Sequence, residues 1–317
     1  MAHVVGTISL SHSPLWNLAP DPPLGEEGGA FVRHVEQARG IIESLRPDVI
    51  VLFGPDHARG VFYDVLPPFT IGIERVEGVG DYHTPKGEIP LAEELARAIF
   101  SGVTSRGFDP AISLDMRIDH GLTQVYSRLV PGLGIPIVPI IVNSGCSPLP
   151  AFSRTYDFGK AVGEAIAAST GDERVVTVGS GGMSHWPAST DAFDPAITPQ
   201  WRDFLIHGRP LVDEMEAGRV AKLQALADGA ATGRVEAGWD RGVLERTVAD
   251  PTVFRRLDEE DVMHLGGPGA HEIRTWAAAT AAWGGTLEWS AYEPVPRWIT
   301  GMGIVASAAP VTPAVVR

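Results

Sequence analysis

Apolar residues in the first 185 positions follow two alternating patterns. Short continuous apolar runs, typical of buried strands, are separated by longer segments in which apolar residues recur every three to four positions, as on one face of a helix. The runs predict strands at 4–10, 48–53, 69–73, 135–142 and 174–178, with a shorter apolar run at 111–114. The periodic segments predict helices at 31–45, 91–103, 122–129 and 151–168.

The second part of the chain has a different pattern. Residues 199–257 are mainly helical in pattern and more charged, a loop follows at 265–269, and a helix is expected at 271–283. Two further strands are candidates, at 286–292 and 303–307. Strands that alternate with helices favour an α/β fold whose central, mostly parallel sheet is covered by helices on both faces. No repeat or linker marks a boundary, so we expect a single domain over 1–317.

Composition narrows the class of protein. The chain has 317 residues, 44% of them hydrophobic, a mean hydropathy of +0.05 and a formal net charge of −14 at pH 7. A chain of this length and apolar content can bury a large core. The net charge offers no basic stripe for a phosphate backbone, so we expect no nucleic-acid partner, whereas an anionic small molecule stays compatible with it.

Cysteine content and apolar runs bear on the compartment. The single cysteine, Cys146, excludes an intramolecular disulfide framework and any multi-cysteine metal site, and it favours a reducing compartment. The first residues lack a basic region, and Ser9, Ser11 and His12 interrupt their apolar stretch, which does not resemble a signal peptide. The apolar run 135–142 is of strand length. We therefore expect a soluble cytoplasmic protein with no membrane partner.

Four histidines share one sequence context. His12, His57, His120 and His185 each follow an apolar strand and lie in a loop rich in Ser, Asp or Gly. Because the loops after the carboxyl ends of parallel strands open on the same edge of a sheet, we expect these side chains to converge on a metal or acid-base site. The alternative is four separate structural histidines.

A carboxylate would complete a metal site with two of these histidines. Two His and one Asp or Glu form the facial triad of non-haem Fe(II) oxygenases, which leaves other metal positions open. Glu272 is the late candidate, although capping and the helix dipole also favour a Glu in the first turn of a helix. Asp56 and Asp119 are rival ligands, or they are acceptors that orient the histidine next to each of them.

The glycine-rich segment 179–182 precedes Met183 and His185 without matching a known catalytic motif. It lacks the spacing and the lysine of a phosphate-binding P-loop, and it has no G-x-G-x-x-G pattern. The following residues do not form the G-x-S-x-G elbow of a serine hydrolase. We expect these glycines to let the backbone turn tightly and bring His185 near a ligand.

Seven segments in the same order carry a specific resemblance. The chain resembles the class III, LigB-type extradiol ring-cleaving dioxygenases nearly from end to end. The matching segments are 9–15, 51–57, 62–69, 119–121, 179–185, 271–276 and 294–299. The resemblance implies cleavage, with Fe(II) and dioxygen, of a catechol that carries a short carboxylated side chain.

The resemblance also implies roles for particular residues. It places Fe(II) on His12, His57 and Glu272, with His120 as the proton donor and His185 as the proton acceptor, both free of the metal. Imidazoles titrate near neutral pH, so one can act as a base and another as an acid in the same pocket.

Three further residues are candidates for contact with the substrate: Arg59, Asp119 and Trp186. Arg59 follows His57 closely and could pair with a substrate carboxylate, or it could be a solvated surface arginine. Trp186 and Met183 flank the proposed base.

Two other functions use similar residues. One is a non-redox binding protein resembling the Memo type, which would not need both His120 and His185. The other is a zinc hydrolase, since imidazole and carboxylate ligands suit either metal. The resemblance further implies a homo-oligomer. The remaining histidines are expected to be structural or exposed: His3, His34, His83, His207, His264 and His271.

Overall fold

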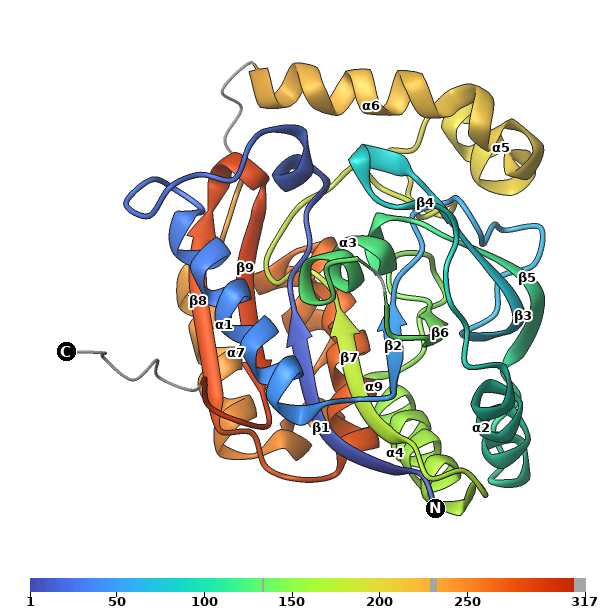
Figure 1. Cartoon of the computed structure of the whole chain (residues 1–317). Coiled ribbons are helices and arrows are strands. Elements are labelled where there is room, and N and C mark those ends of the chain that lie inside the picture. Colours follow the sequence, from blue (N-terminus) through green and yellow to red (C-terminus); the bar gives the residue numbers. More distant parts are fainter. Residues whose placement is uncertain (133, 229–232, 311–317) are drawn as a thin grey trace.

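Within the part of the chain that the structure describes, nine strands form one mixed sheet in the order β4-β3-β6-β2-β7-β1-β9-β8, with β5 paired to β3. Figure 1 shows their arrangement. The computed structural model describes residues 1–132, 134–228 and 233–310. The strands are β1 (His3–Leu10), β2 (Val49–Gly54), β3 (Phe69–Val79), β4 (Lys86–Glu88), β5 (Ala111–Ile118), β6 (Ile137–Val142), β7 (Arg174–Ser180), β8 (Trp289–Val295) and β9 (Thr300–Ala306).

The centre of the sheet is parallel, and β5 at its flank pairs in parallel with β3. Strands β6, β2, β7 and β1 pair in parallel, whereas β9 is antiparallel to β1 and β8, and β3 is antiparallel to β6 and β4. The α/β prediction is confirmed, and the flanking strands make the sheet mixed. The reason lies in the connections, because β8 to β9 and β2 to β3 follow one another without the crossover helix that a parallel pair needs.

Helices cover both faces of the sheet. One face carries α1 (Gly29–Leu45) and α3 (His120–Leu129), and the other carries α2 (Glu93–Ser105), α4 (Phe152–Ala168) and α9 (Ile273–Trp283). The sequence of β2 is continuously apolar because both of its faces are buried. Ile50 and Leu52 lie in the core on the first face, and Val51 lies in the core on the second.

The segment predicted to be helical at 199–257 holds three longer helices. They are α5 (Pro199–His207), α6 (Val212–Asp228) and α7 (Ala237–Ala249), and α8 (Glu259–Asp261) follows. In Figure 1, α5 and α6 lie above the carboxyl ends of the central strands. Shorter helical turns are η1 (Pro14–Leu18), η2 (Asp81–His83), η3 (Arg209–Leu211), η4 (Pro251–Arg256), η5 (Val262–Gly266), η6 (Pro268–Glu272) and η7 (Pro296–Trp298).

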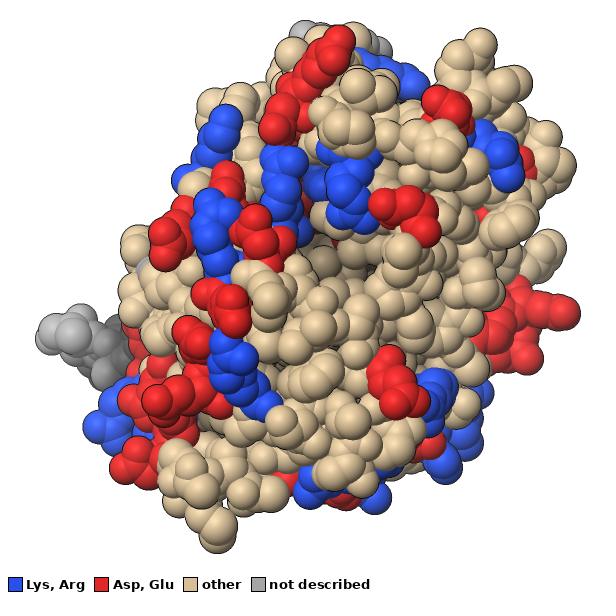
Figure 2. Space-filling view, turned by 90° about the vertical axis from the view of Figure 1, so that its right-hand side faces the viewer, with Lys and Arg blue, Asp and Glu red and all other residues tan. Residues whose placement is uncertain are grey.

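Two features of the surface and helices bear on partners. The face on the side of β3 and β5 carries acidic and basic side chains next to one another, without a continuous basic area (Figure 2). Among the residues that the structure describes, no helix combines the length and apolar character needed to cross a membrane.

Candidate metal centre

The structure brings the four predicted histidines together at the carboxyl edge of the sheet. His12 follows the end of β1, His57 follows β2, His185 follows β7, and His120 begins α3 just after β5. The ring centroids of His12 and His57 are 5.4 Å apart, and those of His57 and His120 are stacked at 4.3 Å. Strand ends that are parallel and adjacent in the sheet therefore place distant histidines in one cluster.

Glu272 supplies the carboxylate at the centre of this cluster. Its Oε1 lies 3.2 Å from Nε2 of His57 and 3.6 Å from Nε2 of His185, and its Oε2 lies 3.5 Å from Nε2 of His12. The backbone amide of Gly182 donates to Oε2 at 2.7 Å. The side chain makes no capping hydrogen bond to α9, so helix capping does not explain this glutamate.

Charges in the cluster set unequal protonation states. Burial lowers the pKa of His12 to about 3, so its imidazole is neutral. Burial also opposes charge on His57, but Asp119 and Glu272 raise its pKa to about 10. Burial alone would raise the pKa of Glu272, yet the nearby His12 and His185 hold it well below its usual range. A divalent cation held by these groups would replace the proton of His57.

Hydrogen bonds orient the rings of His12 and His57 through Nδ1, the outer nitrogen of each ring, which points away from Glu272. Nδ1 of His12 lies 3.0 Å from Oγ of Ser180, and Nδ1 of His57 lies 3.1 Å from Oδ2 of Asp119. The same Asp119 oxygen accepts the backbone N–H of His57 at 2.7 Å. Partners of this kind fix the ring orientation of metal-binding histidines and leave Nε2 facing inward.

His120 and His185 have outer partners of different charge. Nδ1 of His120 lies 2.6 Å from Oδ2 of the buried Asp81, a carboxylate. Nδ1 of His185 lies 2.8 Å from the carbonyl oxygen of Met183, which can only accept. The Met183 carbonyl requires a proton on Nδ1 of His185, so in the neutral ring Nε2 is the basic nitrogen. The Asp81 carboxylate likewise accepts from Nδ1 of His120.

The two rival carboxylates lie in other positions. Asp119 contacts the outer nitrogen of His57, where an orienting acceptor belongs, and its other oxygen accepts the amide of Gly121. Asp56 accepts three backbone amides of its own loop, from residues 59 to 61, which turns its carboxylate into that loop. This geometry places Glu272 between the Nε2 atoms of His12 and His57, and neither aspartate there.

The donor chemistry around His12 and His57 fits a divalent metal ion in two ways. His12, His57 and Glu272 form a set of two imidazoles and one carboxylate, which suits non-haem Fe(II). His12, His57 and His120 also offer nitrogens that all lie within 4.8 Å of one another, a three-imidazole set that suits zinc. His12 and His57 belong to both sets, so Glu272 and His120 distinguish them.

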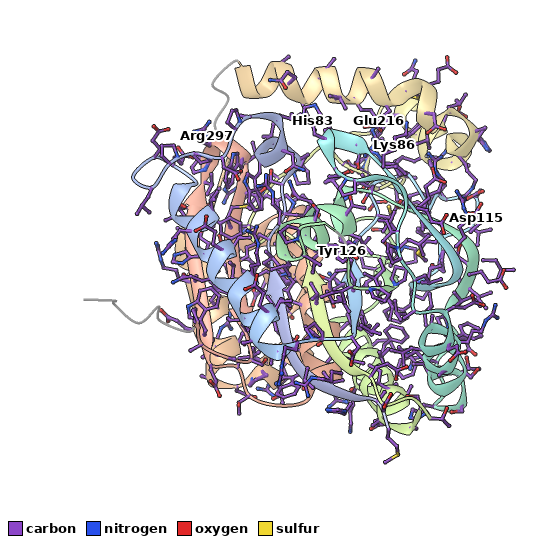
Figure 3. The ribbon with its side chains drawn as sticks, viewed as in Figure 1. His83, Lys86, Asp115, Tyr126, Glu216 and Arg297 are labelled. Atoms are coloured by element: carbon purple, nitrogen blue, oxygen red, sulfur yellow. The ribbon has the colours of Figure 1, made fainter. Side chains whose placement is uncertain are left out.

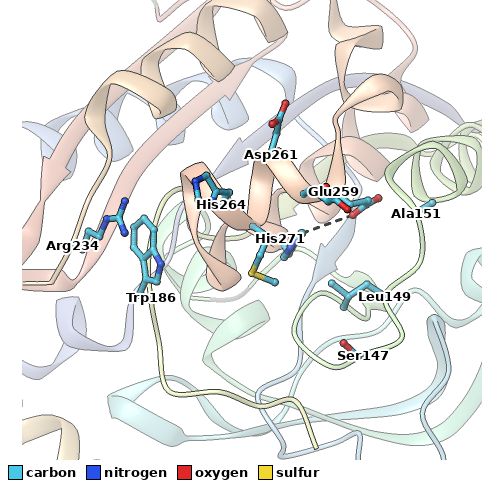
Figure 4. Close-up of a pocket in the computed structure, with 11 residues that line it drawn as sticks. Ser147, Leu149, Ala151, Trp186, Arg234, Glu259, Asp261, His264 and His271 are labelled. Atoms are coloured by element: carbon cyan, nitrogen blue, oxygen red, sulfur yellow. Dashed lines mark ion pairs between the residues drawn. The ribbon is translucent and has the colours of Figure 1, made fainter. Parts of the chain in front are cut away.

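The candidate substrate residues lie apart from one another. Arg59 is only 1% exposed and its guanidinium pairs with Glu216 of α6, so the alternative of a solvated surface arginine is wrong. Trp186 lines a cavity of about 1020 Å³ in which the guanidinium of Arg234 lies over its ring at 4.1 Å (Figure 4). None of the cluster's imidazoles, nor Glu272, lines that cavity.

Glycines near the cluster are required by close approach. A Cβ on Gly182 would lie 2.7 Å from Cε1 of His185, and a Cβ on Gly269 would lie 2.2 Å from its Nε2. Among the described residues, no glycine of 179–182 has a positive φ. The glycine-rich segment therefore makes room for His185, and the tight turn expected from the sequence is not its main role.

Several contributing residues carried no clear signal in the sequence. Asp81 precedes Tyr82 and His83, whose φ angles of 47° and 61° are left-handed and strained for residues with a Cβ. Asp240 of α7 is fully buried and accepts both the amide and the hydroxyl of Ser184, next to His185. Asp240 comes from a segment whose sequence is simply charged and helical, so its partner could not be predicted.

The remaining histidines lie outside the cluster. His3, His83, His207 and His264 are exposed and His34 is half-buried. His271 is buried, and its Nδ1 lies 2.5 Å from a guanidinium nitrogen of Arg274. Burial and the charge of Arg274 lower the pKa of His271 to about 3, which keeps it neutral.

Comparison with known proteins gives three findings. Residues 6–303 match the family described as the catalytic LigB subunit of aromatic ring-opening dioxygenase. The 2,3-dihydroxyphenylpropionate/2,3-dihydroxicinnamic acid 1,2-dioxygenases of Escherichia coli (strain K12) and Shigella sonnei (strain Ss046) are each 34% identical over 315 residues, covering 94% of this chain and 96% of the relative. The solved structure of an uncharacterized protein from Escherichia coli K12 has a TM-score of 0.49 at 17% identity, covering 95% of this chain and 99% of its own.

Proposed function

Because the chain belongs to the LigB family of aromatic ring-opening dioxygenases, we propose that it cleaves a catechol ring outside its two hydroxyl groups, with Fe(II) and dioxygen. The proposed substrate carries a short carboxylated side chain, as in 2,3-dihydroxyphenylpropionate or 2,3-dihydroxycinnamate. A ring C–C bond next to a hydroxylated carbon breaks, and both atoms of dioxygen enter the product, so no external reductant is needed. We place this activity in one catalytic domain over 1–317, in a cytoplasmic homo-oligomer.

One observation carries this proposal: Glu272 faces Nε2 of both His12 and His57, with two further imidazoles beside it. These residues would hold Fe(II), which supplies the redox chemistry between the catechol and dioxygen when bound. The protein's own contribution is to hold the ligands with their outer nitrogens hydrogen-bonded, and to place proton-transferring groups beside them.

The two other imidazoles divide the proton transfers. His185, whose neutral ring presents a basic Nε2, would take a proton from a catechol hydroxyl. His120, whose Nδ1 contacts the Asp81 carboxylate, would hold a proton on Nε2 and donate it to an oxygen atom of the reacting substrate. The difference between a carbonyl and a carboxylate partner therefore supports one base and one acid in the same site.

Oxygen uptake tests the proposed function. Protein purified anaerobically and given stoichiometric Fe(II) is expected to consume one dioxygen per molecule of 2,3-dihydroxyphenylpropionate and to form a yellow ring-opened product. Zn(II)-loaded protein is the matched control and should consume none. No uptake with this substrate or any other catechol would overturn the proposal.

Asp81→Asn tests whether the carboxylate beside His120 matters for proton donation. The amide can still accept from Nδ1, and Thr84 still contacts the other side-chain atom, so the fold should persist. We expect metal content and KM to stay near wild type while kcat falls about 10- to 100-fold, part of the range for general acid-base catalysis. Steady-state oxygen uptake measures both constants.

The matched control for this variant is Asp64→Asn, since Asp64 is exposed and pairs with Arg209 away from the cluster. It should leave kcat unchanged. A wild-type kcat in Asp81→Asn would remove Asp81 from catalysis, and a loss confined to metal content would assign it a purely structural role.

A further inference from the structure

The proposed substrate has a side-chain carboxylate, and the metal cluster contains no arginine or lysine to bind it, so this inference rests on the proposed function. A two-carbon linker places the carboxylate only roughly 4 Å from the ring, since each C–C bond is about 1.5 Å. The cation that binds it must therefore lie next to the cluster. Four described arginines lie beside a cluster residue or its sequence neighbour: Arg59, Arg219, Arg234 and Arg274. The guanidinium of Arg274 is already paired with Glu259.

Arg59 is already engaged by protein groups. Its Nε and Nη2 contact the two carboxylate oxygens of Glu216 at 3.1 and 3.0 Å, and Nη2 also contacts the hydroxyl of Tyr82 at 3.2 Å. Its Nη1 donates to the carbonyl of His57 at 2.9 Å. A substrate carboxylate would have to displace Glu216 from a side chain that is 1% exposed.

Arg234 is a poor carboxylate site for electrostatic reasons. Its Nε and Nη2 both lie 2.8 Å from a carboxylate oxygen of Glu236. The cavity that it shares with Trp186 is also lined by acidic side chains, at positions 259 to 261 (Figure 4). An anionic side chain that entered this cavity would meet like charges.

Arg219 differs from both. It belongs to α6, and it lies one helical turn after Glu216, which is labelled on the side of α6 facing the sheet in Figure 3. Its Nη2 donates to the carbonyl of His57 at 2.6 Å and its Nη1 to that of Ala58 at 3.0 Å. Among the described residues, no carboxylate forms an ion pair with it.

The surroundings of Arg219 favour an anion. Carbonyl oxygens align the guanidinium without neutralising its charge, and two of its five N–H donors are used in these bonds. The rings of Trp201 and Phe204 lie 5.6 Å from it.

We propose that Arg219 binds the side-chain carboxylate of the substrate and thereby selects carboxylated catechols over neutral ones. The guanidinium is anchored to the backbone of the candidate metal ligand His57, so a carboxylate that it binds also positions the ring relative to the metal site. A planar guanidinium fork with free N–H donors matches a carboxylate better than an ammonium does. Arg219 is thus a specificity-determining residue contributed by α6.

The test compares 2,3-dihydroxyphenylpropionate with its neutral primary amide, which has nearly the same shape. For the wild type, Arg219→Met and Arg219→Lys, we would measure kcat/KM by oxygen uptake and Kd by anaerobic equilibrium dialysis. In Arg219→Met we expect the preference for the acid over the amide to fall on the order of 10- to 100-fold, as for a lost charge-assisted hydrogen bond. Arg219→Lys should keep part of the preference.

The amide substrate separates a loss of specificity from damage to the His57 loop, because such damage would lower kcat/KM equally for the acid and the amide. Arg234→Met is the matched control and should leave the ratio of acid to amide unchanged. The proposal is overturned if Arg219→Met leaves the ratio of acid to amide unchanged, which includes an equal loss of kcat/KM for both substrates. It is also overturned if Arg234→Met lowers that ratio, or if the wild type binds acid and amide with the same Kd. Anaerobic selectivity without turnover would retain the role of Arg219 while removing the proposed reaction.

Discussion

Glu272→Ala is expected to leave the purified protein with only traces of metal and with no detectable ring cleavage. The carboxylate contacts Nε2 of His12, His57 and His185, so in the proposed site it would supply both a ligand and the negative charge that a divalent cation needs among imidazoles. Without it, the two remaining candidate ligands are neutral when they bind a metal. Metal analysis per folded protein and oxygen uptake with 2,3-dihydroxyphenylpropionate measure the two effects.

His120→Gln is the informative companion, because His120 replaces Glu272 in the alternative three-imidazole set. The His120→Gln variant should keep its metal and lose its ring-cleaving activity. Metal retained in Glu272→Ala and lost in His120→Gln would reassign the ligands. Zinc as the native metal, together with ester or amide cleavage, would then favour the zinc hydrolase over the dioxygenase. Thermal unfolding of both variants shows that each remains folded.

His185→Gln is expected to retain metal but to turn over about 10²- to 10⁴-fold more slowly, the usual contribution of a positioned acid or base. In the wild type, Nδ1 of His185 donates to the Met183 carbonyl, which leaves Nε2 as the nitrogen of the neutral ring that can take a proton in the proposed reaction. Glutamine has no basic nitrogen to take that proton. Raising the pH ionises more catechol in solution, so the deficit relative to wild type should narrow as pH rises.

His264→Gln is the control for His185→Gln, since His264 is exposed and outside the cluster. Its turnover should match that of the wild type. A wild-type rate in His185→Gln would remove its role as the base. Loss of metal in that variant would instead make His185 a ligand.

A Memo-type binding protein stays the non-catalytic alternative to the proposed enzyme. The hydrogen-bond partners of His120 and His185 argue against a binding protein. A binding cleft has no need for one imidazole on a carboxylate, as in His120, and another on a carbonyl, as in His185. Turnover of any catechol by the wild type would exclude a purely binding role.

Most of the central elements could be predicted from the sequence. The continuous apolar run of β2 is buried on both faces, so its pattern needs no partner to be recognised. The direction of the flanking strands was harder to predict from the sequence. The sequences of β8 and β9 resemble those of ordinary strands, and only the direct connection between them makes the pair antiparallel. Glu272 could be proposed, but its helix-capping alternative could be removed only by its contacts.

By itself, the sequence determined the alternation of strands and helices, the placing of four histidines after apolar runs and the family resemblance, because each depends on residues close together in the chain or on ordered motifs. Only the tertiary structure decided which groups meet. Asp81 contacts His120 across 39 positions and Arg219 contacts His57 across 162. Such pairs leave no local pattern, since their geometry comes from strand order in the sheet and from the position of α6 over its edge. The group beside each imidazole, on which the proposed division between acid and base rests, is therefore a property of the fold.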